Sequence, residues 1–513
     1  MITTKYKFRS FATIPPGNVR NLFLAGLTGV LLVFAFPKPD LGLVAFVALV
    51  PLLISIRQAK WREAAGLGFI AGLIFFAGSL YWITPTVVQY GSLPWAVALG
   101  ILLLLAGYLA IYFAGFAAGV AFLGQNGVIF VLFTGGLWVT FELLRSRILI
   151  AFPWNLLGHS QYQNLPLIQI ADATGVYGIS FVVAAVNAAI ADTVAGNFRW
   201  GKATSSLATA VLLVGGAVIY GWMVQPRISG PVIRVALLQG NISQDIKWDP
   251  RFQDETMAAY QNLTLAQTQV HPDLVIWPET AVPFFLRHDQ RRVSVEKLAD
   301  EINGSLLVSA PDHDGRASPR YTVSAFLIKP KIGITSTYDK IRLVPFGEYV
   351  PLKRILFFVT KLTQGAVGEF SPGTQMTVFS IPSAKFSVSI SYEIYFATDV
   401  RRFVQKGAEF LVNITNDAWY GRSAAPFQHL SMVVFRAVEN RRYLVRAANT
   451  GISAIVDPNG RIVSRSDLFE STAVRGTITP NSDLTFYARY GDIFAWGIVS
   501  IVGIELLIAA MRY

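Results

Sequence analysis

The sequence predicts a polytopic bundle of about eight membrane-spanning α-helices joined to an α/β layered domain. Three observations predict this fold class. The 513 residues are 53% hydrophobic and only 14% charged, with a mean hydropathy of +0.47, which is too apolar for an ordinary soluble protein. Apolar segments follow one another closely up to residue 225. From residue 231 to 480, short apolar runs alternate with helix-like stretches, as in layered α/β domains.

Each apolar segment is near the roughly 20 residues that a helix needs to cross a bilayer. The predicted membrane helices are 20–36, 42–57, 65–84, 94–123, 127–148, 176–195, 205–224 and 491–511. We therefore divide the chain into a membrane domain (1–225), an α/β domain (226–485) and a C-terminal membrane helix (486–513).

Basic residues gather in three short segments: before the first predicted helix, between the second and third, and between the sixth and seventh. They are Lys5, Lys7, Arg9, Arg20, Arg57, Lys60, Arg62, Arg199 and Lys202. Because Lys and Arg favour cytoplasmic loops, both termini are predicted to be cytoplasmic and residues 225–490 to lie on the other side. The net charge of +12 is explained in the same way, so we expect a membrane partner and no nucleic acid.

Within the α/β domain, strands are predicted where β-branched and aromatic residues are concentrated, and helices where apolar residues recur at helical spacing. The predicted strands are 232–239, 274–277, 305–309, 325–329, 335–339, 386–390, 410–415, 447–450 and 453–456. The predicted helices are 254–270, 291–302, 397–406 and 424–442.

Some charged residues are best explained by ion pairs along helices. Glu142, inside a membrane segment, has Arg145 three positions later. The last predicted helix carries a second set, Arg436, Glu439, Arg441 and Arg442. The absence of cysteine excludes disulfides, thiolate metal sites and iron–sulfur clusters, and the five histidines are scattered. We therefore expect neither a metal nor a cofactor.

Three polar residues each follow an apolar, β-branched run: Glu279 in Trp277-Pro-Glu279, Lys340 after Asp339, and Ser391. A carboxylate, an ammonium and a hydroxyl are the groups needed for acyl transfer through a covalent intermediate. Each also has a structural explanation: a helix cap or salt bridge for the glutamate, a surface position for the lysine, and a helix N-cap for the serine.

Further polar residues accompany these three. Glu348 follows Lys340 in an unusually apolar loop and either orients the lysine or the substrate, or caps the loop. Glu393 lies near the predicted start of a helix, where a carboxylate interacts favourably with the helix dipole. Asn416 follows another strand, so its side chain is predicted to line the same crevice at the strand ends.

The combination of these segments resembles the Glu–Lys–Cys triad of the nitrilase superfamily. Other segments are similar to the apolipoprotein N-acyltransferases of the bacterial inner membrane, and this resemblance extends over nearly the whole chain. They are Phe152-Pro-Trp154, Gly158-His-Ser-Gln161, Gln239-Gly-Asn241, Lys247-Trp248, Asn416-Asp-Ala-Trp419 and Asn449-Thr-Gly451.

The resemblance implies an αββα sandwich with Glu279 as general base, Lys340 as stabiliser of the oxyanion and position 391 as nucleophile. It implies that Glu348 is an additional essential acid and that Glu393 is the glutamate after the nucleophile. It places substrate-binding residues at Trp248, Trp419, Asn416, Tyr392 and Phe346. The implied ping-pong reaction moves an acyl chain from a phospholipid, typically phosphatidylethanolamine, to the enzyme and then to the α-amine of a diacylglyceryl-cysteine lipoprotein. The enzyme is expected to be a monomer in the inner membrane, with its catalytic domain in the periplasm.

One position departs from the family pattern: the resemblance implies Cys at 391, and the chain has Ser391. A hydroxyl is far less acidic than a thiol and normally needs a stronger base. We therefore predict that the chain as written is inactive or trapped. A substitution made to trap a substrate state explains the serine better than natural divergence does.

The apolar run 355–359, with Lys353, Arg354 and Lys361 beside it, is predicted to lie at the membrane interface as a mobile lid. A core helix is the other interpretation. Three alternative functions stay open: a membrane-tethered amidase or nitrilase, a non-catalytic lipoprotein-binding scaffold, and a transporter or receptor with a periplasmic binding domain.

Overall fold

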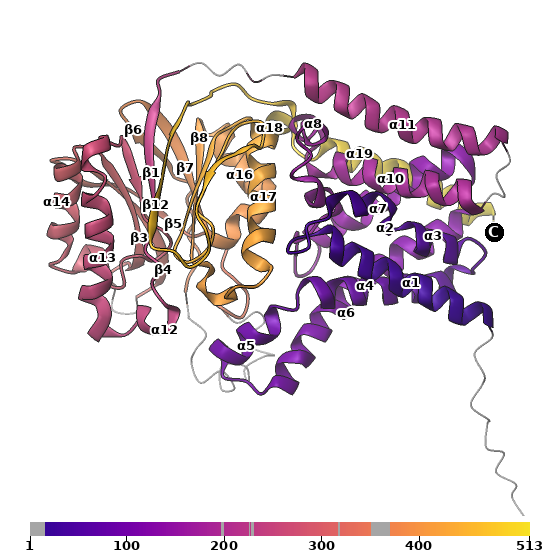
Figure 1. Cartoon of the computed structure of the whole chain (residues 1–513), viewed down its shortest axis with the longest axis horizontal. Coiled ribbons are helices and arrows are strands. Elements are labelled where there is room, and N and C mark those ends of the chain that lie inside the picture. Colours follow the sequence, from indigo (N-terminus) through magenta and orange to yellow (C-terminus); the bar gives the residue numbers. More distant parts are fainter. Residues whose placement is uncertain are drawn as a thin grey trace, which may run out of the picture.

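The computed structural model consists of a helical bundle beside a two-sheet α/β domain (Figure 1). It describes residues 16–195, 200–224, 226, 230–316, 319–349 and 370–512. The predicted lid at 355–359 lies outside the described residues. The start of α1 and the C-terminus lie at the end of the bundle farthest from the sheets (Figure 1).

Helices occur at all eight predicted apolar segments, and α11 is followed directly by the first strand. The bundle consists of α1 (Pro16–Ala35), α2 (Ala45–Ala48), α3 (Val50–Ile56), α4 (Trp61–Ser79), α5 (Ile83–Gly91), α6 (Trp95–Leu123), α7 (Gly127–Arg147), α8 (Leu165–Ile168), α9 (Ala171–Thr174), α10 (Val176–Ala195), α11 (Trp200–Met223) and, near the C-terminus, α18 (Phe486–Tyr490) and α19 (Ile493–Arg512).

Among the described residues, six helices are long and apolar enough to cross a membrane: α4, α6, α7, α10, α11 and α19. The two other predicted segments form shorter apolar helices, 19–35 and 42–56. The second of these is broken between α2 and α3, where Pro51 lies in the first turn of α3. The predicted fold class is confirmed, and the number of spanning helices remains approximate.

The α/β domain contains two six-stranded sheets in the orders β12-β1-β2-β3-β4-β5 and β11-β10-β9-β8-β7-β6. The first comprises β1 (Ile233–Gln239), β2 (Leu274–Ile276), β3 (Ser305–His313), β4 (Tyr321–Lys329), β5 (Gly333–Asp339) and β12 (Thr472–Ile478). The second comprises β6 (Val378–Ile381), β7 (Ala384–Ile390), β8 (Phe410–Thr415), β9 (Leu444–Ala448), β10 (Ala454–Val456) and β11 (Ile462–Arg465). Strands β1, β2 and β3 are parallel neighbours, as are β7, β8 and β9.

Helices cover the outer faces of the two sheets, giving an αββα sandwich (Figure 1). One outer layer is α13 (Gln253–Leu265) and α14 (Arg292–Ile302), which follow the short α12 (Gln244–Lys247). The other is α16 (Ala397–Gln405) and α17 (Ala425–Asn440), and this layer lies between the sheets and the bundle. The sheets bury one apolar core between them, with Leu237 and Ile276 on one side and Val388 and Val412 on the other.

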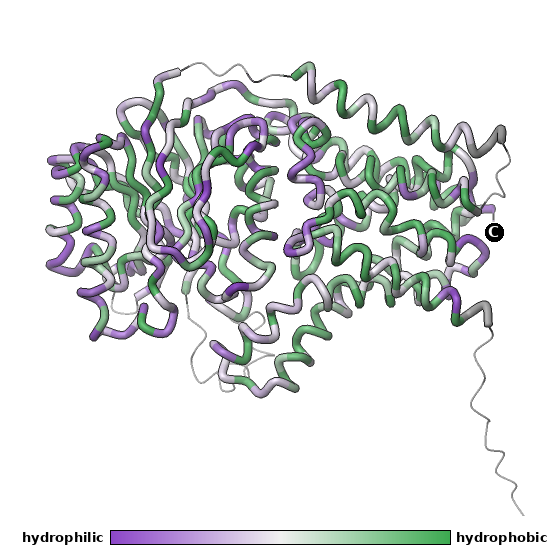
Figure 2. Tube along the Cα trace, viewed as in Figure 1, coloured by the Kyte–Doolittle hydropathy of each residue, from purple (hydrophilic) through white to green (hydrophobic). Residues whose placement is uncertain are grey.

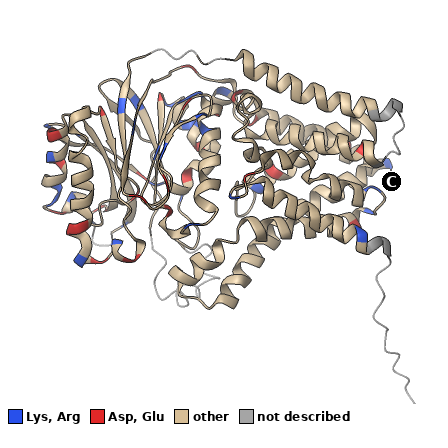
Figure 3. Ribbon diagram, in the orientation of Figure 1, with Lys and Arg blue, Asp and Glu red and all other residues tan. Residues whose placement is uncertain are grey.

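The membrane half and the α/β half share a continuous apolar core. Buried side chains of α17, such as Val434 and Val438, belong to the same cluster as Ile168 on α8 of the bundle. Apolar residues cover the bundle helices, while charged residues concentrate on the α/β half and at the ends of the bundle (Figures 2 and 3). The contact between the halves is thus built like a protein core, which fixes the α/β domain against the bundle.

Two of the ion-pair predictions are corrected by the structure. Glu142 and Arg145 form no ion pair among the contacts of the described residues. Glu142 instead accepts a hydrogen bond from the Leu157 amide at 2.6 Å, and Arg145 donates to backbone carbonyls of the 152–155 loop, with Trp154 O at 2.7 Å. Both side chains therefore hold the loop that follows α7, because its carbonyls and amides lack partners within a helix.

In the second set, the predicted pair Arg436–Glu439 is confirmed at 2.9 Å. Arg441 and Arg442 do not pair along the helix, because α17 ends at Asn440 and Arg441 has a φ of +50°. Arg441 reaches Asp172 on α9 at 2.8 Å. Arg442 donates to backbone carbonyls, including that of Asp483 at 2.7 Å.

Candidate functional site

The sequence-predicted polar residues lie where strands of both sheets end. Ser391 directly follows β7, Asn416 directly follows β8, Lys340 directly follows β5, and Glu279 follows β2. Strand β5 is antiparallel to β4, which is antiparallel to β3, so β5 runs in the same direction as β2 and β3. The ends of β2 and β5 therefore meet at one edge of their sheet, and those of β7 and β8 at one edge of the other.

Lys340 lies between two carboxylates. Its Nζ is 3.0 Å from Glu279 Oε1 and 2.6 Å from Glu348 Oε1, and its side chain is only 1% exposed. Burial alone would lower the pKa of Lys340, but the two carboxylates raise it above its usual value. The second oxygen of Glu348 accepts from the Val344 amide at 2.8 Å, which fixes the loop after Lys340. The two carboxylates therefore favour the ammonium form of Lys340 and hold it between them.

Glu279 is fixed by contacts from three directions. Its Oε1 accepts from Lys340, and its Oε2 accepts from the Asn416 amide at 3.0 Å. Its backbone carbonyl accepts from the Nζ of Lys247 at 3.0 Å. The Asn416 side chain donates to Gln244 Oε1 at 2.7 Å and accepts from Asn449 Nδ2 at 3.0 Å. Asn416 thus bonds to Glu279 through its backbone, and its side chain anchors the turn that makes this contact.

Ser391 occupies a left-handed backbone conformation, with a φ of +50°. It is the first residue of a 3-10 helix, Ser391–Tyr395, that begins where β7 ends. A non-glycine residue with positive φ at such a strand-to-helix turn is a strained geometry, of the kind that presents a nucleophile.

Glu393 ties this turn to the lysine loop. Its Oε2 accepts from the Ile390 amide at 2.8 Å, and its Oε1 accepts from Tyr338 Oη at 2.8 Å. The same Oε1 accepts from the amides of the two residues after Lys340, Ile341 at 2.7 Å and Arg342 at 3.0 Å. Burial raises the pKa of Glu393 to about 7, although these hydrogen bonds oppose the shift. Position 391 and Lys340 are thus joined through one buried carboxyl group.

Lys247 is a site residue that sequence reasoning noted only as the neighbour of Trp248. It is buried, and burial lowers its pKa to about 8 from a usual value near 10.5, while Glu279 opposes that shift. Between pH 8 and pH 10.5, Lys247 is protonated in the unfolded chain but largely deprotonated in the folded chain. The unfolded chain then binds more protons, so the free energy of unfolding rises with pH.

We expect Lys247→Met to remove this increase, which is on the order of 3 kcal/mol between pH 8 and pH 10.5. The measurement is thermal unfolding in detergent over this pH range. Because tyrosines and other lysines also titrate there, the informative quantity is the difference between the parent and the variant. If the free energy of unfolding changed with pH by the same amount in both proteins, the lowered pKa of Lys247 would be contradicted.

The predicted substrate-binding aromatics lie around the site with different exposures. Trp248 is 45% exposed, Trp419 38% and Phe346 46%, whereas Tyr392 is half-buried. Trp419 packs edge-on against Tyr90 of α5, with ring centroids 4.9 Å apart. The sequence analysis did not predict α5 as a separate helix, so it missed this contact between the bundle and the site.

A second buried network supports the Asn416 turn. Asp417 forms an ion pair with Arg446 at 2.6 Å, and His429 Nδ1 lies 3.3 Å from Asp417 Oδ1 and 2.9 Å from Arg446 Nη2. Arg446 also donates to Asn413. Burial lowers the pKa of His429 to about 4, so the ring is neutral at physiological pH. Sequence reasoning missed Arg446 and His429 because they lie far from position 417 in the chain and form no local motif.

Gln428 lies on α17, in the helical layer between the sheets and the bundle, and its side chain connects this layer to the bundle. Its Oε1 accepts from the indoles of Trp82 at 3.2 Å and Trp154 at 2.9 Å. Its Nε2 donates to the carbonyls of Pro37 and Ser79, both at 3.0 Å. All four hydrogen-bonding positions of this amide are used. Within the described parts of the chain, no group of three or more His, Cys, Asp or Glu residues is arranged to hold a metal ion.

Comparisons with known proteins match both halves of the chain. The sequence model of the apolipoprotein N-acyltransferase N-terminal domain matches residues 28–189, and that of carbon-nitrogen hydrolases matches residues 234–485. Apolipoprotein N-acyltransferases of Geobacter metallireducens and Methylococcus capsulatus are 42% and 34% identical. The first alignment covers 96% of each chain, and the second 95% of this chain and 96% of the relative.

Solved structures similar to about half of this chain include an amidase and a member of the nitrilase superfamily. An amidase from Nesterenkonia sp. is 19% identical with a TM-score of 0.39, over 53% of this chain and 98% of that one. A nitrilase-superfamily protein from Saccharomyces cerevisiae is 18% identical with a TM-score of 0.38, over 50% of this chain and 93% of that one.

Proposed function

The chain belongs to the apolipoprotein N-acyltransferase family, and we propose that its site transfers an acyl chain from a membrane lipid to the N-terminal amine of a diacylglyceryl-cysteine lipoprotein. Its substrates are a lipid and a lipoprotein, and it is a bacterial membrane protein. The observation that carries the proposal is the buried Glu279–Lys340–Glu348 cluster, joined through Glu393 to the strained turn at Ser391.

In the first half-reaction, Glu279 accepts the proton of the nucleophile at position 391 as the nucleophile attacks the ester carbonyl of the lipid. The negative charge that develops on the carbonyl oxygen is stabilised by the ammonium of Lys340, which acts most strongly in a site that excludes water. The bond from the carbonyl carbon to the glycerol oxygen then breaks. Glu279 returns its proton to that oxygen, and a lysophospholipid leaves.

In the second half-reaction, the lipoprotein amine attacks the acyl-enzyme. Glu279 takes a proton from the amine, and the bond from the acyl carbon to the nucleophile breaks. The proton then returns to the nucleophile, and the amide product leaves. The enzyme returns to its starting state, which is a ping-pong cycle with no cofactor. With Ser391, the nucleophile is a hydroxyl activated only by a carboxylate, so we propose that the chain as written is inactive or trapped.

We propose phosphatidylethanolamine as the usual acyl donor and a monomer as the working unit. A donor panel tests the first point: phosphatidylethanolamine, phosphatidylglycerol and phosphatidylcholine with equal chains are compared in the Ser391→Cys protein. The formation of acylated diacylglyceryl peptide, measured by mass, tests the function itself. Equal rates with all three donors would remove the headgroup preference and leave the transfer reaction intact.

We also propose the division into 1–225, 226–485 and 486–513, with the α/β domain in the periplasm and both termini in the cytoplasm. The basic loop at Arg57, Lys60 and Arg62 supports this orientation, because α3 and α4 meet at the end of the bundle farthest from the sheets (Figure 1).

The cysteine-free chain allows a direct test of the orientation. A single cysteine at exposed Asp254 on α13 is expected to react with a membrane-impermeant maleimide in intact spheroplasts, and one at exposed Lys60 only after permeabilisation. The readout is the mass shift of the purified protein. Labelling of Lys60→Cys alone in intact cells would reverse the proposed orientation.

A further inference from the structure

Basic residues gather where the α/β domain meets the ends of the membrane helices. They form a basic rim that comes from the end of α7, the segment after β5, α16 and α18: Arg147, Arg342, Arg401, Arg402, Lys406 and Arg489. Asp399 and Asp492 are the carboxylates paired with three of these cations. Lys406 and Arg489 form no ion pair with the described residues. The rim therefore has more cations than carboxylates paired with them.

The exposed face of α16 is turned toward the bundle. Phe403 and Val404 are buried on one side of the helix. Thr398 and Arg402, four positions apart, lie on the other side. Thr398 Oγ1 accepts a hydrogen bond from Arg147 Nη2 at 2.9 Å, and Arg147 is the last residue of α7. The exposed Arg402 therefore faces the end of the bundle, where the membrane helices reach the α/β domain.

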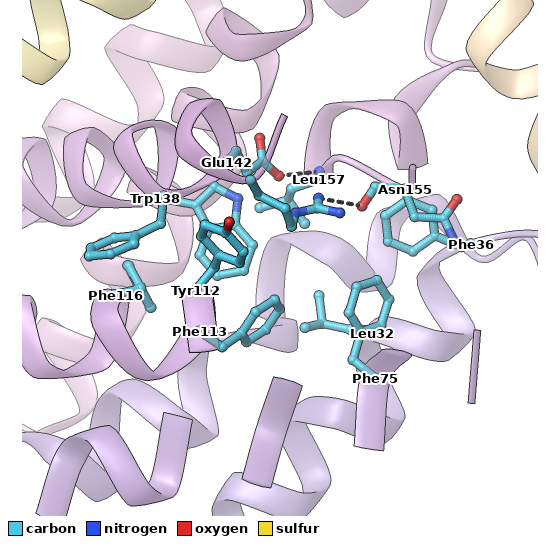
Figure 4. Close-up of a pocket in the computed structure, with 12 residues that line it drawn as sticks. Leu32, Phe36, Phe75, Tyr112, Phe113, Phe116, Trp138, Glu142, Asn155 and Leu157 are labelled. Atoms are coloured by element: carbon cyan, nitrogen blue, oxygen red, sulfur yellow. Dashed lines mark hydrogen bonds between the residues drawn. The ribbon is translucent and has the colours of Figure 1, made fainter. Parts of the chain in front are cut away.

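Arg147 ties the ends of three helices together at this level. The chain that follows α7 is fixed, because Glu142 accepts from the Leu157 amide at 2.6 Å (Figure 4). Besides its bond to Thr398 near the start of α16, Arg147 forms an ion pair with Asp492, the residue before α19. The end of α7 and the starts of α16 and α19 are therefore held side by side.

Aromatic side chains indicate the depth of this region in the membrane. Arg401 Nη1 donates to Ala488 O at 3.2 Å, which attaches α18 to α16. Phe486 and Tyr490 on α18, and Trp496 in the first turn of α19, are each about half exposed. Tyrosine and tryptophan are enriched at the membrane–water interface. Because α19 is long and apolar enough to cross a membrane, the basic rim lies at the level of the lipid headgroups.

The charge of the rim is opposite to the charge expected on its side of the membrane. Lysine and arginine favour cytoplasmic loops, yet the rim lies on the side of the α/β domain, for which we propose a periplasmic location. An anionic partner at headgroup level accounts for this positive charge, because phosphate oxygens accept charge-assisted hydrogen bonds from guanidinium groups. A zwitterionic lipid carries its own cation beside the phosphate, whereas phosphatidylglycerol carries the phosphate charge alone.

We propose that the basic rim binds the headgroups of anionic phospholipids and holds the α/β domain against the membrane surface. The exposed aromatic side chains beside the rim favour a lipid over a soluble phosphate ester, because they offer contacts to the interfacial part of the lipid. Binding at the rim requires no acyl transfer. It can therefore be tested in the Ser391 protein, and its outcome is independent of the proposed function.

The test is native mass spectrometry of the Ser391 protein in detergent, with equal amounts of phosphatidylglycerol and phosphatidylcholine that have the same chains. We expect the parent protein to retain phosphatidylglycerol preferentially. In Arg402→Gln/Arg489→Gln this preference should fall about fivefold or more, since each basic residue at an anionic lipid surface contributes a factor of about five. Both side chains are exposed, so the variant should unfold at the parental temperature. Equal retention of the two lipids by the parent, or an unchanged preference in the variant, would overturn the proposal.

A matched control removes the same charge from the far side of the molecule. Arg292→Gln/Lys297→Gln changes two exposed residues of α14, in the outer layer farthest from the bundle (Figure 1). We expect this variant to keep the parental lipid preference. A loss equal to that of the rim variant would show an effect of net charge and reject the site. Excess glycerol phosphate should leave the lipid bound, and displacement by it would reject a lipid as the ligand.

Hydrogen exchange locates the bound lipid. In nanodiscs of phosphatidylcholine with and without phosphatidylglycerol, we expect the anionic lipid to slow exchange at 397–406 and 484–491 and to leave α14 unchanged. The same protection should be absent from Arg402→Gln/Arg489→Gln. Protection confined to the basic loop at 57–62 would place the anionic lipid at the other end of the bundle and contradict the assignment to the rim.

Discussion

Replacing Ser391 by cysteine is expected to raise the rate of lipoprotein acylation by a factor on the order of 10³ or more. The physical reason is acidity. A thiol has a pKa near 8.5, within reach of a carboxylate base, whereas a serine hydroxyl is far less acidic. A thioester is also a better acyl donor to an amine than an ester is. Lys340 and Glu279 are hydrogen-bonded at 3.0 Å in the chain with Ser391, so the prediction concerns the side chain at position 391 alone.

The measurement combines intact protein mass with peptide mass after incubation with phosphatidylethanolamine and a diacylglyceryl peptide. The cysteine form should carry an acyl adduct and yield the amide product, and the serine form should yield no product. Ser387→Cys is a matched control, because this residue is buried on β7 before the turn and its hydroxyl has no hydrogen-bond partner. A thiol there should give no adduct. If position 391 gives no adduct as cysteine, the covalent mechanism fails and a lipoprotein-binding scaffold becomes the better explanation.

Replacing Lys340 by methionine is expected to slow transfer strongly and to destabilise the fold. Without the ammonium, Glu279 and Glu348 lose the ion-pair partner that they share in a buried site. Removing one partner of a buried ion pair costs about 3–5 kcal/mol, and losing a positioned oxyanion stabiliser costs about 10²–10³ in rate. In the Ser391→Cys background, both effects should appear together.

Two further variants separate charge from geometry at this position. Lys340→Arg retains the charge and should recover much of the stability but little of the activity, because its planar fork cannot occupy the same point between the carboxylates. Adding Glu348→Gln to Lys340→Met should recover part of the stability by removing one uncompensated charge. Thermal unfolding in detergent and the rate of peptide acylation report the two effects. A Lys340→Met protein with parental transfer rates would reject the oxyanion role.

The sequence located most elements because membrane helices and buried strands are defined by local composition. All eight apolar segments contain helices, and the predicted strands match the interior strands of the two sheets and the edge strand β5. The three strands that were missed, β6, β11 and β12, are all at sheet edges. Each of these strands contains exposed side chains among less exposed ones, so they lack the continuous apolar runs by which central strands are recognised. The helix α5 was missed because it is short and directly continues an apolar segment.

What the sequence determined by itself is a set of polar residues at or after strand ends: Glu279, Lys340, Glu348, Ser391 and Glu393. A polar residue after an apolar strand is a local signal, and parallel strands bring their ends to one edge. The tertiary structure alone decided how these groups are held. Lys247, Arg446 and His429 support the site from distant parts of the chain, and Gln428 joins it to the bundle. The same holds for Glu142 and Arg145, whose helical spacing predicts an ion pair but whose side chains bind the 152–157 loop. Local spacing fixes which groups can meet, whereas unpaired backbone groups and burial in the folded chain decide which contacts form.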